Sequence, residues 1–261
     1  MAFGYAASGF AVGLLVGLTG IGGGSLMTPL LILLFGIHPT TAVGTDLLFA
    51  SATKAAGAII HGTQRTVVWP LVGRLLLGSL PAAGLTLIVL DHLGVHGMVA
   101  NRTVSHLLAF LLLITAAALL ARPCLLRYAS RWQGGQRPEA GPAATLPATV
   151  AIGLVLGVVV TVCSVGAGAL GTVALLLLYP RFGIAKIVGS DIAHAVPLTL
   201  IAGLGHWWLG SVNLGILLPL LAGSVPGIVL GSLGVRFAPE PLLRIGLAVL
   251  LAITGLRLLH A

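Results

Sequence analysis

AVGTD (42–46) and IVGSD (187–191) are nearly the same five residues, and they lie 145 positions apart. A second pair keeps that spacing, because GSLPAAGL (78–85) returns as GSVPGIVL (223–230). A third pair, TGIGGGSLMT (19–28) and CSVGAGALGT (163–172), lies one residue off the same register. The chain is therefore predicted to consist of two structural repeats, and a ligand site is expected where the two halves meet.

The composition is that of a protein embedded in a membrane. Of the 261 residues, 58% are hydrophobic and only 7% are charged, whereas a soluble domain has about 25% charged residues. The formal net charge is +8. The basic residues lie in short loops, so membrane topology explains them and no nucleic-acid partner is expected. Cys124 and Cys163 have no metal-ligand spacing, and neither a metal nor another cofactor is predicted.

Apolar segments divide each half into a broken hairpin and three longer spans. Residues 7–18 and 25–35 are each too short to cross a bilayer, since a full span needs ~20 residues. The cluster GIGGGS (20–25) separates them, so we predict a helical hairpin whose Gly-rich tip lies near mid-membrane. The predicted spans that follow are 40–61, 66–90 and 103–121; the second half repeats the order with a hairpin at 148–180, broken at SVGAGALG, and spans 184–206, 212–235 and 240–259.

The predicted organisation is a first membrane repeat (1–121), a polar linker (122–147) and a second membrane repeat (148–261). Most Lys and Arg residues outside the spans fall on the linker's side of the membrane, and basic loops remain in the cytoplasm. The linker is therefore predicted to be cytoplasmic and both chain ends to lie outside. Each half then crosses an odd number of times, either three times with a re-entrant hairpin or five times. We expect an all-α polytopic protein of the plasma or inner membrane with two inverted-topology repeats.

The segment GLLVGLTGIGGGSLMTPLLILLFGIHPTTAVGTDLL (13–48) resembles the sulfite exporter TauE/SafE family of membrane transporters. That family has a Gly-rich first segment, a following Pro and an AVGTS-like segment that opens the next helix; GSDIAHAVPL and GSVPGIVLG match it in the second half. The resemblance extends over essentially the whole chain and implies a secondary transporter of small sulfur-containing anions, such as sulfite, sulfonates or thiosulfate. The chain departs from the family pattern at Asp46, where a small polar residue is commoner, and at Ala167 and Ala169.

The two Gly-rich tips are the predicted anion site. A helix that begins at mid-membrane directs free N–H groups and a partial positive charge at whatever lies in front of it, and glycines let an anion approach the backbone. The alternative is that the glycines only allow close helix packing. The predicted substrate-binding residues are Thr19, Gly22, Gly23, Gly24 and Ser25 of the first tip, Ser164, Gly166 and Gly168 of the second, and Lys54.

Charged residues inside the predicted spans are the second group of candidates. Asp46 and Asp191 occupy equivalent repeat positions, and two roles compete for them: carrying coupling protons, or capping the starts of their helices. His194 follows Asp191 by three residues and is a candidate relay partner. Lys54 lies near the centre of a span, where it fits an anion pathway, although pairing with a carboxylate on another helix or snorkelling would also explain it. His206 is expected at the membrane interface beside Trp207 and Trp208.

The function predicted from these features is secondary transport of small sulfur-containing anions by alternating access. Transport of another small anion or metabolite is the first alternative. An intramembrane enzyme is the second, although the chain lacks HExxH and GxSxG motifs, so no catalytic residues are assigned and no enzyme is predicted. The expected partners are the small anionic substrate and the lipid bilayer, and the small residues on several helices are compatible with a homodimer.

Overall fold

Ten α-helices and no strand are formed by the residues that the computed structural model describes, namely 2–19, 26–92, 98–132, 142–165, 168, 170–180, 182–233 and 240–260. The helices are α1 (Ala2–Thr19), α2 (Met27–Phe35), α3 (Pro39–Thr63), α4 (Trp69–His92), α5 (Met98–Trp132), α6 (Pro142–Cys163), α7 (Leu170–Leu178), α8 (Ile184–Trp208), α9 (Leu214–Leu233) and α10 (Glu240–His260).

The second five helices follow the order of the first five. The short helices α2 and α7 have nine residues each, and α3 and α8 have 25 each. Both bounds of α8 lie 145 positions after the matching bounds of α3. The turns that follow these two helices also correspond, because Arg65 and Gly210 both have positive φ, 55° and 71°. The 145-residue register of the sequence therefore reappears in the bounds of the helices.

The helices differ from the predicted spans at the first hairpin arms and at the linker. The first arms are longer than expected, since α1 has 18 residues and α6 has 22. Helix α5 has 35 residues and continues through RPCLLRYASRW, the first part of the predicted linker. That stretch contains no Gly and a single Pro, Pro123, and the first Gly of the linker comes only after Trp132. Its residues are therefore compatible with helix in spite of their charge.

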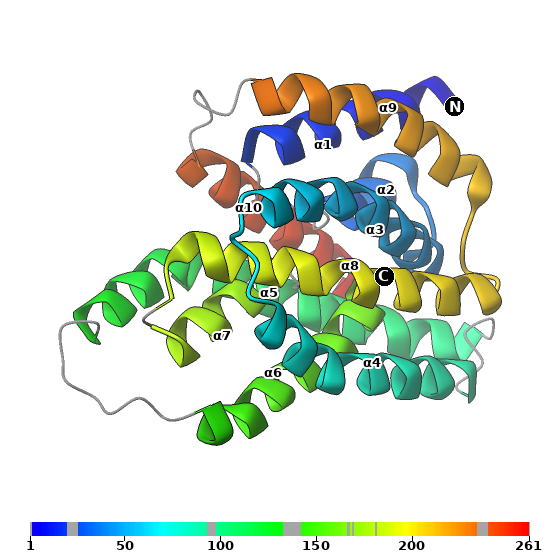
Figure 1. The fold of residues 1–261 in the computed structure, drawn as a ribbon. Coiled ribbons are helices and arrows are strands. Elements are labelled where there is room, and N and C mark those ends of the chain that lie inside the picture. Colours follow the sequence, from blue (N-terminus) through cyan, green and yellow to red (C-terminus); the bar gives the residue numbers. More distant parts are fainter. Residues whose placement is uncertain are drawn as a thin grey trace.

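Helices from the two halves pack against each other in matched pairs. Helix α1 packs along α9, α6 packs along α4, and α3 packs antiparallel along α8. Figure 1 shows α1 and α9 along one edge of the molecule and α4 and α6 along the opposite edge, with α3 and α8 between them. At the middle of the α3–α8 pair, Ser51 Oγ lies 3.4 Å from the carbonyl of Val196, which is its own repeat equivalent.

Glycines allow the backbones of the two outer pairs to touch. A Cβ on Gly13 of α1 would lie 2.8 Å from Cα of Ser224 on α9, and a Cβ on Gly157 of α6 would lie 2.9 Å from Cα of Ser79 on α4. Real Cβ atoms do not approach so closely, so only glycine fits at these two places. This is the close packing of small residues that membrane helices use in place of a hydrophobic driving force.

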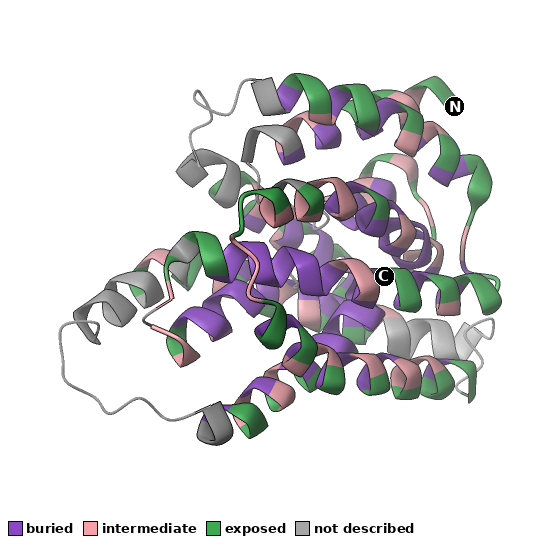
Figure 2. Ribbon diagram, in the orientation of Figure 1, coloured by how far each residue is buried: buried purple, intermediate pink, exposed green. Residues whose placement is uncertain are grey.

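Unlike a soluble protein, the molecule exposes many large apolar side chains and buries several charged ones. The exposed surface carries many large apolar side chains, including Phe3, Leu85 and Leu218. The interior holds Asp46, Lys54, Asp191 and His194, all at most 3% exposed; Figure 2 shows buried residues gathered at the centre, where α3 and α8 lie. Among the described residues, five helices are long and apolar enough to cross a membrane: α3, α4, α8 and the larger parts of α6 and α9. The predicted class, an all-α polytopic membrane protein, is confirmed.

Candidate functional site

The buried carboxylate of Asp46 holds the start of the short helix α2. Asp46 lies on α3, and its Oδ2 accepts two hydrogen bonds from Thr28, one from the backbone N–H at 3.0 Å and one from Oγ1 at 2.6 Å. Leu26, the N-cap residue of α2, provides no side-chain cap. The first turn of a helix has N–H groups without an intrahelical partner, and Asp46 supplies the missing acceptor from a different helix.

Asp191 of α8 makes the equivalent contact with α7. Thr172 Oγ1, in the first turn of α7, donates a hydrogen bond of 2.8 Å to Asp191 Oδ2. Gly171 lies so close to the same carboxylate that a Cβ there would be 3.1 Å from Asp191 Cγ. Each short helix is therefore fixed by its first-turn Thr to an Asp on the long helix that follows it in the chain.

The expectation that the two aspartates cap their own helices is wrong. Neither α3 nor α8 has an acidic residue in its first turn. The sequence placed each Asp near the start of a span, but α3 begins at Pro39, about two turns before Asp46. The carboxylates therefore lie beyond the first turns of their own helices and bind the starts of the neighbouring short helices. Whether they also carry protons stays a prediction.

The hydroxyl residues that precede the two aspartates connect the halves. Thr45 Oγ1 accepts a hydrogen bond of 3.2 Å from the N–H of Asn213, just before α9. Ser190 Oγ accepts one of 2.9 Å from the N–H of Val68, just before α4. In each of the Thr-Asp and Ser-Asp dipeptides, the Asp therefore binds the start of a helix in its own half. The hydroxyl residue before it binds the start of a helix in the other half.

Ser164 comes from the second broken segment and lies beside Asp46 of the first half. It directly follows α6, has φ 56° and is 1% exposed. A positive φ is uncommon for a residue other than glycine. Its side chain lies near the Asp46 carboxylate without forming a hydrogen bond to it, and among the described residues Ser164 Oγ and Asp46 Oδ1 both have no hydrogen-bond partner. The end of α6 and the start of α2 therefore meet at Asp46.

Lys54 and His194 complete a cluster of buried charged and titratable groups. Lys54 is 3% exposed and interacts electrostatically with both aspartates, more strongly with Asp191 than with Asp46. His194 is also close enough to Lys54 to interact with it electrostatically. Its Nε2 lies 2.8 Å from Ser79 Oγ of α4, and its buried Nδ1 has no hydrogen-bond partner within the described part of the chain. Pairing with a carboxylate of another helix and snorkelling were the two alternatives to an anion pathway for Lys54. Its burial excludes snorkelling.

Ser79 is the neighbour of this cluster that the sequence analysis did not assign. It lies inside GSLPAAGL, one of the repeated segments, and its equivalent is Ser224. A polar residue inside a repeated apolar segment is the signal that could have identified it. Its contact with His194, from a helix 115 positions away in the chain, could not be inferred from spacing.

The structure brings part of the predicted site together. Lys54 of α3 interacts with Asp46 of the same helix and with Asp191 and His194 of α8, and Ser164 lies near Asp46. The backbone of Thr19 ends α1, and the carbonyl of Gly168 accepts a hydrogen bond of 2.7 Å from Thr172 Oγ1. The predicted residues Gly22, Gly23, Gly24, Ser25 and Gly166 lie outside the described residues.

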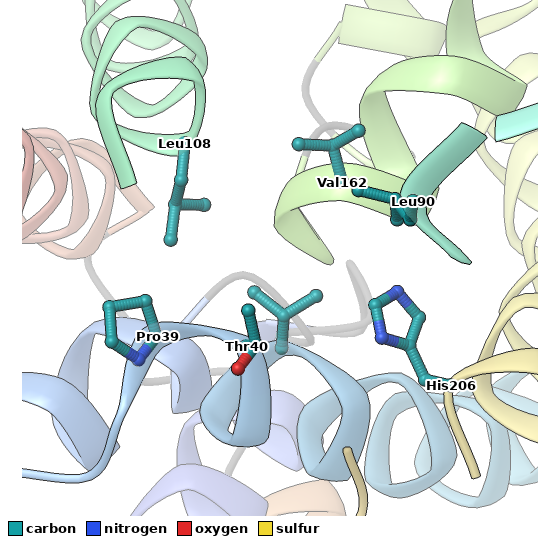
Figure 3. Close-up of a pocket in the computed structure, with 7 residues that line it drawn as sticks. Pro39, Thr40, Leu90, Leu108, Val162 and His206 are labelled. Atoms are coloured by element: carbon teal, nitrogen blue, oxygen red, sulfur yellow. The ribbon is translucent and has the colours of Figure 1, made fainter. Parts of the chain in front are cut away.

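His206 is buried inside the protein, in the last turn of α8, and its place at the membrane interface stays a prediction. It is 3% exposed, and its Nε2 donates a hydrogen bond of 2.9 Å to the carbonyl of Thr161, whereas Trp207 and Trp208 are exposed. Its ring borders a cavity of about 10 Å³ between the start of α3 and the ends of α4, α6 and α8 (Figure 3). The other residues that line this cavity are Pro39, Thr40, Val43, Leu90, Leu108 and Val162. A cavity of this size holds about one water molecule, so it is too small for an organic substrate.

The described residues contain no group of three or more His, Cys, Asp or Glu side chains that could hold a metal ion. The chemistry available at the cluster is therefore that of two carboxylates, one ammonium, one imidazole and several hydroxyls. Such a set can bind a small ion and exchange protons.

Comparisons with known proteins agree with this architecture. The family described as sulfite exporter TauE/SafE matches residues 5–258. The chain is 39% identical to the probable membrane transporter protein YjnA of Bacillus subtilis over 96% of this chain and 97% of that protein. It is 26% identical over the same shares to the probable membrane transporter protein YdhB of the same organism. No solved structure matches the chain.

These names describe membrane transporters and not enzymes. The multi-pass architecture and the family match both point to membrane transport. On the strength of a match over nearly its whole length, the chain belongs to the sulfite exporter TauE/SafE family.

Proposed function

We propose that this protein is a secondary transporter of small sulfur-containing anions that works by alternating access. The observation that carries the proposal is the meeting of both broken segments at one buried charged cluster. Asp46 accepts hydrogen bonds from the start of α2 and faces Ser164 at the end of α6. An anion bound between the two Gly-rich tips would lie beside this cluster, where the halves of the protein join.

Lys54 supplies the attraction for the anion. A buried ammonium in a membrane span is expensive and is by default a functional group, and no polar solvent screens it at 3% exposure. The starts of α2 and α7 add partial positive charge beside Asp46 and Asp191, respectively. Sulfite, thiosulfate and small sulfonates are compact oxyanions that fit such donors.

The charge of the cluster favours coupling to protons. With both aspartates ionised and His194 neutral, two carboxylates and one ammonium leave a net charge of −1, which repels an anion. Each proton taken up by Asp46, Asp191 or His194 raises the charge by one. The anion would therefore bind together with one or more protons, and these three residues are the candidates for carrying them.

The proposed topology follows from the charge distribution of the loops. The linker lies in the cytoplasm, both ends lie outside, and the halves are inverted relative to each other in the plasma or inner membrane. The matched pairs α1–α9 and α6–α4, each built from one helix of either half, support a mechanism in which these pairs move relative to the central α3–α8 pair. A homodimer is compatible with this arrangement.

The test is flux of radiolabelled sulfite, thiosulfate and a small sulfonate into proteoliposomes, with and without an imposed pH gradient. We expect flux of at least one anion, and we expect it to rise with the gradient. Flux driven by membrane potential but indifferent to pH would remove the proton from the mechanism. No flux of any of the three in folded protein would refute the sulfur-anion substrate and favour another small anion or metabolite.

A further inference from the structure

The two repeat-related aspartates have different surroundings. Lys54 of α3 corresponds to Thr199 of α8, and His194 of α8 corresponds to Phe49 of α3. Ser164, which faces Asp46, corresponds to Gly20 in the register of the Gly-rich tips, so the first tip has no hydroxyl at the matching position. A symmetric pair of carboxylates in asymmetric surroundings need not perform the same task.

The two oxygens of Asp46 differ in their contacts. Oδ2 is fully occupied by the N–H and hydroxyl of Thr28. Oδ1 is buried and has no hydrogen-bond partner among the described residues, and the same holds for the nearby Ser164 Oγ. Buried polar atoms without a partner are rare and call for an explanation such as an unobserved ion or proton.

The end of α6 adds a reason for a positive charge at this place. Ser164 directly follows the last residue of α6, and its N–H still bonds to the carbonyl of Val160. The last carbonyls of a helix carry a partial negative charge, so a carboxylate beside them is disfavoured and a cation is favoured. Interrupted membrane helices use such ends together with side-chain oxygens to hold coupling cations.

Asp191 accepts a hydrogen bond from Thr172, and of the two aspartates it is the stronger electrostatic partner of Lys54. An opposite charge nearby favours the charged form of both groups. Asp191 and Lys54 then offset each other, and Asp46 is left with the uncompensated charge.

We propose that a compact monovalent cation, either H⁺ or Na⁺, binds between Asp46 Oδ1 and Ser164 Oγ, and that Asp46 rather than Asp191 carries the coupling charge. A proton on Oδ1 would donate a hydrogen bond to Ser164 Oγ, and a sodium ion would be coordinated by both oxygens. Either cation removes the net negative charge beside the anion site. Only the role of the cation in coupled transport rests on the proposed function; the binding of the cation can be tested without any anion.

Other titratable groups must be separated from Asp46 in the test. Lys54 on the same helix and Cys163 on α6 interact electrostatically with Asp46, and Asp191, His194 and His206 lie on α8, which packs against α3; the described residues of α2 and α9 contribute none. Single variants at Asp46, Asp191 and Ser164 distinguish between these groups, because only the proposed site loses its cation when either Asp46 or Ser164 is changed.

The experiment is thermal unfolding of the purified full-length protein in detergent. One series replaces choline chloride by NaCl at constant ionic strength and pH, and the other lowers the pH at constant salt. We expect the melting temperature to rise in one of the two series, since a ligand that binds the folded state stabilises it. The series that responds identifies the cation as Na⁺ or H⁺.

Ser164→Gly is the main variant, because glycine tolerates the positive φ of this position and is the residue found at the equivalent position of the first repeat. We expect it to weaken the cation response about tenfold in concentration, or to move its midpoint by about one pH unit, as for the loss of one hydrogen bond to a charged group. Asp46→Asn should abolish the response, and Asp191→Asn should preserve it. Ser211→Ala is the matched control, since Ser211 is also a buried serine whose hydroxyl has no partner among the described residues.

The proposal is overturned if neither series stabilises the wild-type protein, if Ser164→Gly responds like wild type, or if Asp191→Asn abolishes the response. A cation response that follows the expected pattern in protein without sulfur-anion flux would refute the proposed substrate and leave the cation site standing. Anion flux without any cation response would refute the cation site and leave the proposed substrate standing.

Discussion

At the scale of single residues, two Thr–Asp contacts fix the starts of the short helices α2 and α7. Thr28 and Thr172 each lie in the first turn of a nine-residue helix, and each donates its hydroxyl hydrogen to an aspartate of the next long helix. A helix of nine residues is too short to be stable by itself, even in a favourable sequence. Its start must therefore be fixed from outside, and a buried carboxylate does this at the place where the proposed anion would bind.

Replacing Thr28 by Val tests this contact. The substitution keeps the shape of the side chain and removes the donor of the 2.6 Å hydrogen bond to Asp46. A hydrogen bond to a charged group contributes about 1.5–3 kcal/mol, so we expect the free energy of unfolding in detergent micelles to fall by that amount. The measurement is an unfolding titration with SDS.

Thr254→Val is the matched control for Thr28→Val. Thr254 is equally buried, but its hydroxyl donates only to the carbonyl of Leu250 in its own helix. Such local bonds add little stability to a helix, so this variant should unfold much like wild type. An equal loss of unfolding free energy in both variants would show that the contact with Asp46 stabilises the protein no more than a local hydrogen bond.

The residues of the site could be predicted from the sequence only as types. Asp46, Asp191 and Lys54 were identified by repetition or by their place in apolar spans. A carboxylate or ammonium group there costs free energy, so it is expected to have a function. The partners could not be predicted, since the sequence does not specify which helix an Asp side chain faces. Thus the capping of α2 and α7 by a neighbouring helix, and the Ser79–His194 contact, emerge only from the packed structure.

At the scale of helices, close packing depends on glycines in the outer pairs. Gly78 of α4 lies against α6, and a Cβ there would be 2.8 Å from Leu154 N and closer still to Val150 O. The atoms in conflict belong to backbone, which cannot move aside as a flexible side chain can. The sequence indicated the spans and the Gly-rich segments, but it could not show which glycines lie in a contact and which face lipid.

Gly78→Ala is expected to destabilise the protein by about 1–3 kcal/mol, the usual cost of overpacking. Gly84→Ala on the same helix is the control, because a Cβ at Gly84 meets nothing within 4 Å. It should cause no loss and a gain of up to about 1 kcal/mol from helix propensity. Thermal unfolding of the two variants side by side gives the answer, and equal effects would contradict the assigned α4–α6 contact.

At the scale of the whole molecule, the inverted distribution of polarity and the register of 145 residues could both be predicted from the sequence. Hydropathy identifies spans because every backbone N–H and C=O group in lipid must be hydrogen-bonded within the protein. A helix satisfies this requirement within a single segment. The length of α5 could not be predicted in this way. Its last residues, which extend beyond the predicted span 103–121, include Arg122, Arg127 and Arg131, and hydropathy does not separate a charged helix from a charged loop.

The orientation of the molecule in the membrane can be tested with its two native cysteines. Cys124 is exposed near the end of α5 and stands between Arg122 and Arg127 in the sequence, so we expect it at the cytoplasmic surface. Cys163 is buried, and its thiol donates to the carbonyl of Val159 at 2.9 Å, which protects it from reagents. The wild-type chain thus contains one reactive reporter of its own topology.

A membrane-impermeant maleimide should label the protein in inside-out vesicles and leave it unlabelled in intact cells. Cys124→Ser should abolish the labelling, and Cys163→Ser should leave it unchanged, which assigns the signal to Cys124. Labelling of wild type in intact cells would place the linker outside and reverse the proposed orientation. Because the basic loops fix the orientation of the whole chain, that result would also exchange the sides to which the two halves of the site open.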